Sequence, residues 1–406
     1  MAESMKRELS KNVIFIGVGK WGDMRIAAEH MAEEFARRGY QVIYLCAAVD
    51  LLLALRDSFV RKNNGFLKDF FRALFRRDPL RDIEPNLVIA PGLALLAGFG
   101  LFRLCDCINE FILWMYIERL AKKKGMRRYV LYSFQYFPTR KRGGHCEYFV
   151  YDCIDNWQSM SGSKRRAARI GVLEKCLVQN VDLWFAISQP LLEQRKQWNV
   201  DGYLELPSFD KSNFIDYRKN SGLAAKMSEF SRPIIGMTST IFSKKIDWQF
   251  LLFAAEAKKN YTFLMVGPCM DTPPEEIRAL KNVFFLGPQP FRDIPYIIEC
   301  LDVALILFRQ NAFGNFALPT KFLEYLWMGK AVVSTDLQSL RPFRDIIDLA
   351  VDREDFVKKI DHCLTTDSPA RREQRTRFAG NFSKEMRAQR ILNRLVAEFE
   401  KKGDGQ

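Results

Sequence analysis

Two charged residues one helical turn apart give the strongest chemical signal in the sequence. Lys321 and Glu324 follow Pro319 and precede Gly329. Proline favours the first turn of a helix and glycine its end, so the spacing predicts a helix with both charged side chains on one face. A lysine at a helix start can neutralise phosphate, and a carboxylate one turn on can accept two ribose hydroxyls. The alternative is a solvated ion pair on an ordinary helix.

A second candidate site lies in the first half of the chain, where two aspartates follow a strand-like run. Asp152 and Asp155 belong to the segment Tyr151-Asp-Cys-Ile-Asp-Asn-Trp157. Because α/β proteins place cleft residues at the carboxyl ends of their strands, we expect both aspartates at such an edge. A carboxylate beside an acceptor hydroxyl can remove its proton as a new bond forms. The alternative is structural: one aspartate caps the following helix and the other pairs with an arginine.

A glycine loop near the N-terminus offers a different chemistry. Gly17, Gly19 and Gly22 fit the dinucleotide pattern GxGxxG between an apolar run and a helical one, where a helix N-terminus can hold phosphate. The acid that would hold the ribose is late, at Asp50, and Trp21 is bulky beside a pyrophosphate. A tight turn that also lines a cleft is the alternative. An NAD(P)-dependent oxidoreductase using this loop remains the competing enzyme hypothesis.

The elements that must position these residues repeat one pattern twice. Short apolar runs alternate with helical stretches from Val13 onwards and again from Pro233 onwards. This order predicts an α/β protein with two Rossmann-like parallel sheets in tandem. Residues 208–231 contain few strong apolar runs and read as the region between the domains. The expected parts are an N-terminal domain at 1–205, a C-terminal domain at 206–383 and a C-terminal helix at 384–406 that packs back on the N-terminal domain.

Composition and charge narrow the class of protein. The chain has 406 residues, of which 48% are apolar, as in globular proteins. Its net charge is +14, and residues 1–200 alone carry +11, so we expect a polyanionic partner to meet the first half. No zinc finger, RRM signature or helix-turn-helix pattern supports nucleic acid as that partner. The nine cysteines include no CxxC pair and favour free thiols in a reducing compartment.

The segment at 317–335, ALPTKFLEYLWMGKAVVST, resembles the nucleotide-binding helix of GT-B glycosyltransferases in the broad group 1, family 4-like set. That family carries the pattern P-x-K-x-x-E-Y-x-x-x-G-K-P-V-V-S-T. Residues 282–308 are similar to its preceding strands, residues 20–45 to its first helix, and residues 151–157 to its signature Y-D-x-x-D-x-W. The resemblance covers most of the chain and implies two Rossmann-like domains that face each other across a cleft.

The resemblance implies that the C-terminal domain binds a nucleotide-diphosphate sugar, which is the donor substrate, with no separate cofactor. Glu324 would bind the donor ribose. The other implied donor residues are Lys321, Lys244 and Lys245 at the diphosphate, Gly267, Gly287 and Pro288 around the base, and Pro319 at the start of the helix.

Two positions depart from the family pattern. The family has an acid eight residues before the glutamate that corresponds to Glu324, and Phe316 stands there in this chain. The usual arginine after the first strand of the domain is replaced by Thr238, which shifts one phosphate contact to the pair Lys244 and Lys245. These departures leave open a non-catalytic protein that binds a membrane surface and has a degenerate transferase fold.

The resemblance assigns the acceptor, a glycan or lipid-linked molecule of cell-surface polysaccharide biosynthesis, to the N-terminal domain. In the inverting members an aspartate at the place of Asp155 is the base, whereas in a retaining enzyme Asp155 would position the acceptor. Positive side chains and helix dipoles would stabilise the leaving diphosphate. No DxD motif occurs, so we expect transfer without a metal. The residues expected on the acceptor side of the cleft are Gly19, Trp21, Arg25 and Asp152.

The basic charge of the first half coincides with an aromatic pattern at 66–77. Phenylalanines recur there at helical spacing with basic residues on the other side, which suits an anionic membrane surface, although core packing with a solvated basic face is the alternative. No apolar run reaches the ~18 residues of a membrane span, and we expect a cytoplasmic protein associated with the inner face of the membrane. The candidate membrane residues are Phe70, Phe71, Arg72, Phe75, Arg76 and Arg77.

Overall fold

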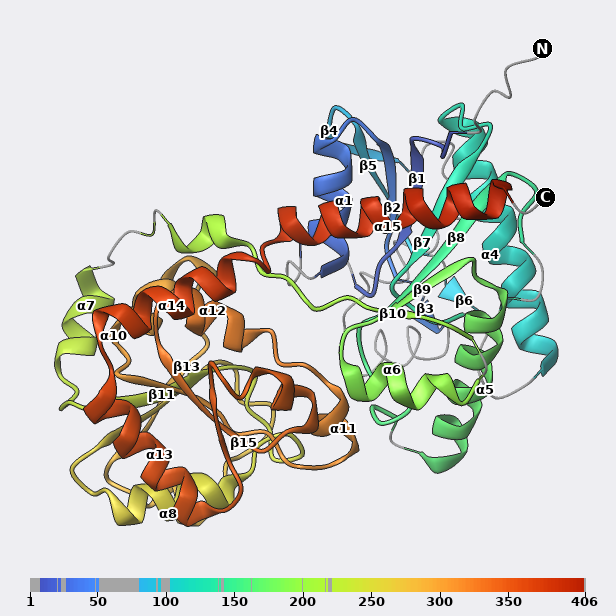
Figure 1. Ribbon diagram of the computed structural model, residues 1–406. Helices are drawn as coiled ribbons and strands as arrows, with labels where there is room; N and C mark the ends of the chain where they lie inside the picture. Colours follow the sequence, from blue (N-terminus) through green and yellow to red (C-terminus); the bar gives the residue numbers. More distant parts are fainter. Residues whose placement is uncertain are drawn as a thin grey trace. The chain divides into compact units, whose positions relative to one another are not determined.

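The computed structural model divides the chain into two compact units (Figure 1). The N-terminal unit comprises Met1–Leu206 and Arg387–Gln406, and the C-terminal unit comprises Pro207–Met386. The structure describes residues 8–19, 21–22, 27–47, 49–50, 80–92, 94–95, 103–137, 139, 142–161, 163–198, 200–215, 217 and 221–404.

An eight-stranded sheet forms the centre of the N-terminal unit, in the order β10-β9-β8-β7-β1-β2-β5-β4. All neighbouring strands are parallel except β4 and β5. The chain moves outward from β1 in both directions, and open α/β sheets bind ligands where the strand order reverses in this way. The strands are β1 (Asn12–Ile16), β2 (Gln41–Leu45), β4 (Arg81–Glu84), β5 (Leu87–Ala90), β7 (Tyr129–Ser133), β8 (Cys146–Cys153), β9 (Leu183–Ala186) and β10 (Tyr203–Leu204), and β3 (Val49–Asp50) pairs separately with β6 (Ala94–Leu95).

Helices cover both faces of this sheet. Apolar side chains of α1 (Ala27–Arg37) and α15 (Lys384–Asp404) share one core with the strands. On α15 the buried residues Ala388, Ile391, Leu392, Leu395 and Phe399 recur at helical spacing and form one stripe. The other face carries α4 (Arg103–Lys123), α5 (Lys164–Asn180) and α6 (Gln189–Lys196).

The C-terminal unit is built on a six-stranded sheet in the order β13-β12-β11-β14-β15-β16, and every neighbouring pair is parallel. The strand order reverses at β11, which lies between β12 and β14. The strands are β11 (Ile234–Thr238), β12 (Thr262–Val266), β13 (Val283–Gly287), β14 (Val303–Ile306), β15 (Ala331–Thr335) and β16 (Asp348–Ala350).

The helices of the C-terminal unit connect these strands. α12 (Lys321–Trp327) begins after Pro319 and stops before Gly329, whose φ of +70° few residues other than glycine adopt. α14 packs beside it, and Arg375 Nε donates to the Gly329 carbonyl at 3.0 Å. The remaining helices are α7 (Ser221–Ser228), α8 (Trp248–Ala257), α9 (Glu275–Arg278), α10 (Ile294–Cys300), α11 (Ala312–Phe316), α13 (Arg353–Thr366) and α14 (Pro369–Gly380), with 3₁₀ turns η1 (Lys211–Phe214), η2 (Phe291–Asp293) and η3 (Gln338–Phe343).

Two helices were not singled out by the sequence pattern. The apolar run at 111–117 is the middle of the 21-residue helix α4, whose polar flanks at Asp106 and Glu110 are buried rather than turned to solvent. The strongly charged segment at 369–380 forms α14, which the apolar pattern did not reveal because only Arg375 and Ala379 of it are buried.

Candidate functional site

In the C-terminal unit the candidate donor residues lie where the strand order reverses. β11 ends at Thr238, and the loops after β11 and β14 leave the sheet at the same carboxyl edge. This is the position at which doubly wound sheets bind nucleotides.

Helix α12 carries the charged pair that the sequence pattern singled out. Lys321 Nζ donates to Glu324 Oε2 at 2.7 Å, and both residues lie on the first turn and a half of the helix. Glu324 is only 7% exposed, whereas the Lys321 side chain keeps 29% of its surface. A partly exposed lysine in this position can bind a phosphate, and the nearly buried carboxylate beside it can accept hydrogen bonds from hydroxyl groups.

A buried tyrosine fixes α12 to the end of β11. The Thr238 backbone N–H donates to Tyr325 Oη at 2.7 Å, and the Thr238 hydroxyl lies 3.1 Å from the same oxygen. Burial raises the pKa of Tyr325, so its hydroxyl stays protonated. Thr238, which stands where the family has an arginine, therefore positions the helix that carries Glu324.

The two lysines after β11 differ in their surroundings. Lys245 Nζ donates to Ser239 Oγ at 2.7 Å and lies 4.3 Å from the centre of the Phe308 ring. Lys244 is exposed to solvent. Lys245 is thus held at the edge where β11 and β14 end, through Ser239 and Phe308, which the sequence pattern did not single out.

The expected base-pocket residues shape the neighbouring strand ends. Gly267 has a φ of +137°, and a Cβ there would clash with the Ser239 carbonyl. Its N–H donates to the Gly287 carbonyl at 2.9 Å, while Pro288 is exposed. Gly267 is therefore required for the close approach of the loops after β11 and β12.

In the N-terminal unit protein side chains contact two of the three glycines of the glycine loop, Gly17 and Gly22. A Cβ at Gly17 would clash with the Tyr44 ring, and the Trp21 ring lies 4.9 Å from that ring, edge on. The Gly22 N–H donates to the buried carboxylate of Glu29 at 3.0 Å. A carboxylate therefore takes one of the amides that a dinucleotide phosphate would need, which weakens the oxidoreductase hypothesis.

The remaining expected residues of the N-terminal unit are only partly covered by the structure. Gly19 is described and would have open space beyond its Cα, whereas Arg25 lies outside the described residues. The candidate membrane residues Phe70, Phe71, Arg72, Phe75, Arg76 and Arg77 also lie outside them.

Asp152, which the sequence placed at the acceptor side of a cleft, is instead fully buried. Its Oδ2 accepts from Tyr132 Oη at 2.8 Å and from the guanidinium of Arg387, on α15, at 2.6 Å. Neither the Asp152 nor the Arg387 side chain has any exposed surface. Burial, and then the charge of Asp152, raise the pKa of Tyr132. The structural alternative therefore holds for Asp152: it binds the C-terminal helix to β8.

The neighbours of Asp152 on β8 point to the opposite face of the sheet, as alternation along a strand requires. The Tyr151 hydroxyl and the Cys153 thiol each lie 3.1 Å from Glu174, which pairs with Arg195 at 2.7 Å in a fully buried ion pair. Burial raises the pKa of both Tyr151 and Cys153, so both remain protonated donors.

This network positions the residues that follow β8. The Cys153 thiol also lies 3.4 Å from the Asp155 carbonyl oxygen, and the Trp157 indole N–H donates to Tyr151 Oη at 3.1 Å. The Trp157 ring lies 5.9 Å from that of Tyr136, which follows β7. Asp155 is half-buried at this carboxyl edge. These contacts thus hold Asp155 and Trp157 in place after β8, and Asp155 remains the predicted catalytic residue.

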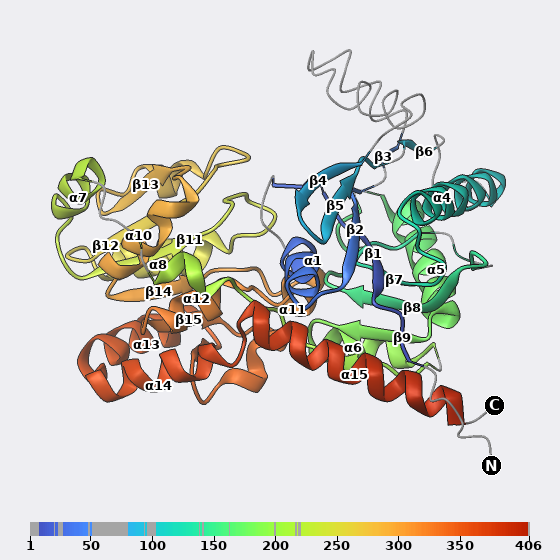
Figure 2. The same cartoon turned by 90° about the horizontal axis from the view of Figure 1, so that it is seen from above.

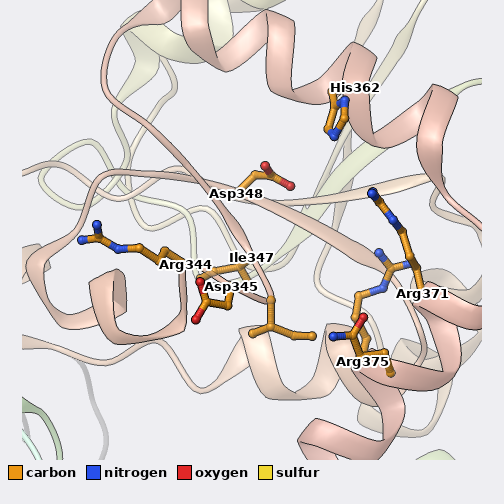
Figure 3. Close-up of a pocket in the computed structure, with 9 residues that line it drawn as sticks. Arg344, Asp345, Ile347, Asp348, His362, Arg371 and Arg375 are labelled. Carbon is orange, nitrogen blue, oxygen red and sulfur yellow. The ribbon is translucent and has the colours of Figure 1, made fainter.

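A polar pocket of ≈ 280 Å³ in the C-terminal unit lies away from these residues (Figure 3). It forms where β16 begins, whereas the donor candidates lie where strands end. Figure 3 shows Arg371 and Arg375 on one side and Arg344 on the other, with Asp345 and Asp348 between them. Arg375 is already bound by Asp367 and by the Gly329 carbonyl. The pocket therefore does not belong to the donor site.

Known proteins resemble both the C-terminal unit and the whole fold. Residues 232–366 match the family model described as glycosyl transferases group 1. A putative teichuronic acid biosynthesis glycosyltransferase, TuaH of Bacillus subtilis, is 26% identical over 234 residues. That alignment covers 54% of this chain and 58% of the Bacillus protein, so the chain spans little more than half of the length of this relative.

Solved structures match nearly the entire chain at low sequence identity. The trehalose-phosphate synthase of Burkholderia vietnamiensis superimposes with a TM-score of 0.67 at 10% identity, covering 96% of this chain and 99% of that one. HepE of Anabaena, solved with UDP and glucose, gives 0.60 at 13% identity, covering 95% and 99%. These likenesses confirm the GT-B fold class, and the family match confirms the resemblance that residues 317–335 indicated.

Proposed function

We propose, on the premise that residues 232–366 form a group 1 glycosyltransferase domain, that the protein transfers a sugar from a nucleotide-diphosphate sugar to a glycan or lipid-linked acceptor in cell-surface polysaccharide biosynthesis. The observation that carries the proposal is the Lys321–Glu324 pair on α12, next to the end of β11. TuaH, named for teichuronic acid biosynthesis, supports the class of pathway.

The donor binds, in this proposal, at the carboxyl edge of the C-terminal sheet. Glu324 accepts the two ribose hydroxyls, and Lys321 and Lys245 face the diphosphate. The 2.7 Å bond between Lys321 Nζ and Glu324 Oε2 orients the carboxylate before the donor arrives. A uridine nucleotide is the first choice, because HepE is solved with UDP and glucose.

The chemical step joins an acceptor oxygen to the anomeric carbon of the sugar and breaks the bond from that carbon to the diphosphate. In an inverting enzyme Asp155 takes the proton of the acceptor hydroxyl. In a retaining enzyme the leaving oxygen of the diphosphate takes that proton, and Asp155 positions the acceptor. The lysines stabilise the leaving diphosphate, so we propose transfer without a metal.

The acceptor side also accounts for the basic charge of the first half. Residues 1–200 carry +11 of the net +14, which favours an anionic membrane surface on which a lipid-linked acceptor would lie. We therefore propose a cytoplasmic protein that associates with the inner face of the membrane.

A thermal-shift screen with UDP, GDP, dTDP and NAD tests the proposal. One nucleoside diphosphate should raise the melting temperature by several degrees, because a ligand that binds only the folded state stabilises it. Stabilisation by NAD alone would overturn the donor assignment and revive the glycine-loop oxidoreductase. A second assay supplies nucleotide sugars together with membrane extract as the acceptor. If the protein binds a nucleotide but releases no diphosphate from any of these sugars, the result would favour the non-catalytic alternative.

A further inference from the structure

The exposed side of α4 has an unusual composition. Its exposed residues are all apolar or basic, and they are Arg103, Leu104, Ile108, Phe111, Met115, Arg119, Lys122 and Lys123. The sequence pattern did not predict an exposed apolar surface here, because the opposite, buried side of the helix is also apolar.

Four of these residues form a single stripe. Leu104, Ile108, Phe111 and Met115 are 71%, 38%, 64% and 54% exposed. Their spacing of four, three and four residues places them on one side of a helix with 3.6 residues per turn. The intervening residues Leu113, Trp114, Tyr116 and Ile117 are buried against the sheet.

Basic residues continue the stripe, and its exposed residues include no acid. Arg119 and Lys122 follow Met115 by four and seven residues and extend the same side of α4. Of the acids of α4, Asp106 and Glu110 are buried. Glu118 borders the stripe with 25% of its side chain exposed, and its carboxylate accepts from Tyr129 and lies 2.6 Å from His145. We call Leu104, Ile108, Phe111, Met115, Arg119 and Lys122 the exposed α4 face.

This face lies near the edge of the sheet that holds the candidate acceptor residues. Tyr116 donates to the carbonyl of Pro91, just after the end of β5, at 3.2 Å. The first residue of α4 lies about 20 Å from Tyr116 along the helix axis, at 1.5 Å per residue. The apolar stripe, which runs from Leu104 to Met115, therefore lies at the carboxyl edge of the sheet or beyond it. Figure 2 shows α4 at the periphery of the N-terminal unit. Asp155 belongs to the same edge.

We propose that the exposed α4 face docks on an anionic membrane surface. This inference rests on the proposed lipid-linked acceptor and names the surface that would bring the enzyme to it. Apolar side chains of a helix lying in the interface enter the acyl boundary, and basic side chains meet the anionic headgroups. Among the described residues, none of the helices has the length and apolarity needed to cross a bilayer.

Co-sedimentation of the full chain with vesicles tests this docking surface. Phosphatidylcholine vesicles with and without phosphatidylglycerol serve as the probes. The wild type should sediment with the anionic vesicles only, and less so at high salt. The double variant Phe111→Glu, Met115→Glu should bind at least about tenfold more weakly, because two apolar side chains that enter the acyl boundary are replaced by charges that the anionic headgroups repel. Arg119→Gln with Lys122→Gln should weaken binding and flatten its salt dependence.

Val396→Glu is the matched control, because it replaces an exposed apolar residue on α15 of the same unit. It should bind as the wild type does. Equal binding by the control and the Phe111, Met115 variant would overturn the proposal, as would a wild type that ignores anionic vesicles. A variant that turns a dimer into a monomer without changing vesicle binding would make this face an interface between copies. Nucleotide affinity, measured in parallel, should be unchanged in every variant, so failure of the donor assignment remains a separate result.

Discussion

The two units hold their candidate residues at the same edge of similar sheets, but in different ways. In the C-terminal unit, Lys321 and Glu324 are three residues apart on one helix and bond to each other. In the N-terminal unit, Asp152 and Asp155 are also three residues apart, yet Asp152 is fully buried and Asp155 is half-buried beyond the strand. The same spacing brings side chains together on a helix and separates them at the end of a strand.

The two motifs therefore have different roles: one carries the candidate binding residues itself, and the other mainly supports the residues that follow it. The α12 motif is itself the site, and one buried tyrosine fixes it to the sheet. The motif at 151–157 is mainly a support, because Asp152 and Tyr151 make buried contacts on opposite faces of β8. Within the motif at 151–157, the residues after the strand, Asp155 among them, are therefore the candidates to meet a substrate.

Substitution of Asp155, the candidate residue beside the acceptor, should have the largest effect on the rate of sugar transfer. Asp155→Asn should lower the rate of sugar transfer by about 10²–10⁴-fold, the usual contribution of a general base, and should leave nucleotide affinity unchanged. Asp201→Asn, at an exposed position of the same unit, is the control. Steady-state transfer and calorimetric titration with UDP measure the two quantities. Full activity of Asp155→Asn would remove it from the chemistry and make the whole motif a support.

The second effect concerns the support itself. Arg387→Ala leaves the carboxylate of Asp152 buried without its ion pair and should lower the free energy of unfolding by about 3–5 kcal/mol. Arg390→Ala is a close control, because Arg390 pairs with Glu205 at 2.7 Å but keeps 36% of its side chain exposed, and exposed pairs contribute only ~0.2–1 kcal/mol. Urea unfolding followed by circular dichroism compares them. Similar losses in both variants would contradict the role given to the Asp152–Arg387 pair.

The smallest effect tests the attachment of α12. Tyr325→Phe removes the hydroxyl that accepts from the buried Thr238 N–H, and should cost about 1–3 kcal/mol of stability. Thr238→Val keeps that N–H bond and removes only the longer contact at 3.1 Å, so it should cost less. The same unfolding measurement ranks the two variants. A larger loss in Thr238→Val would show that the threonine hydroxyl, rather than its backbone, attaches the helix.

Much of the fold was predictable because strands buried on both faces read as uninterrupted apolar runs. The segments at 13–16 and 331–335 are of this kind and became β1 and β15. The α12 pair was predictable for a related reason, since Lys321 and Glu324 lie within one short helix, and Pro319 and Gly329 flank it.

The remaining features depend on distant residues. The partner of Asp152 is 235 residues away, on α15, and no local pattern connects them. The Glu29 carboxylate accepts from the Gly22 amide of the glycine loop, and the loop pattern itself does not include Glu29. The exposed α4 face was hidden because Phe111 and Met115 alternate with buried residues in one apolar run.

The central claim is that α12 holds the donor through Glu324. Calorimetric titration of UDP into the wild type and into Glu324→Ala tests it most directly, with Glu276→Ala, at an exposed position on α9 of the same unit, as the control. Loss of a charged hydrogen-bond acceptor of ~1.5–3 kcal/mol should weaken UDP binding by about 10–100-fold, and the control should bind as the wild type does. Equal UDP affinity in Glu324→Ala and the wild type would contradict the account.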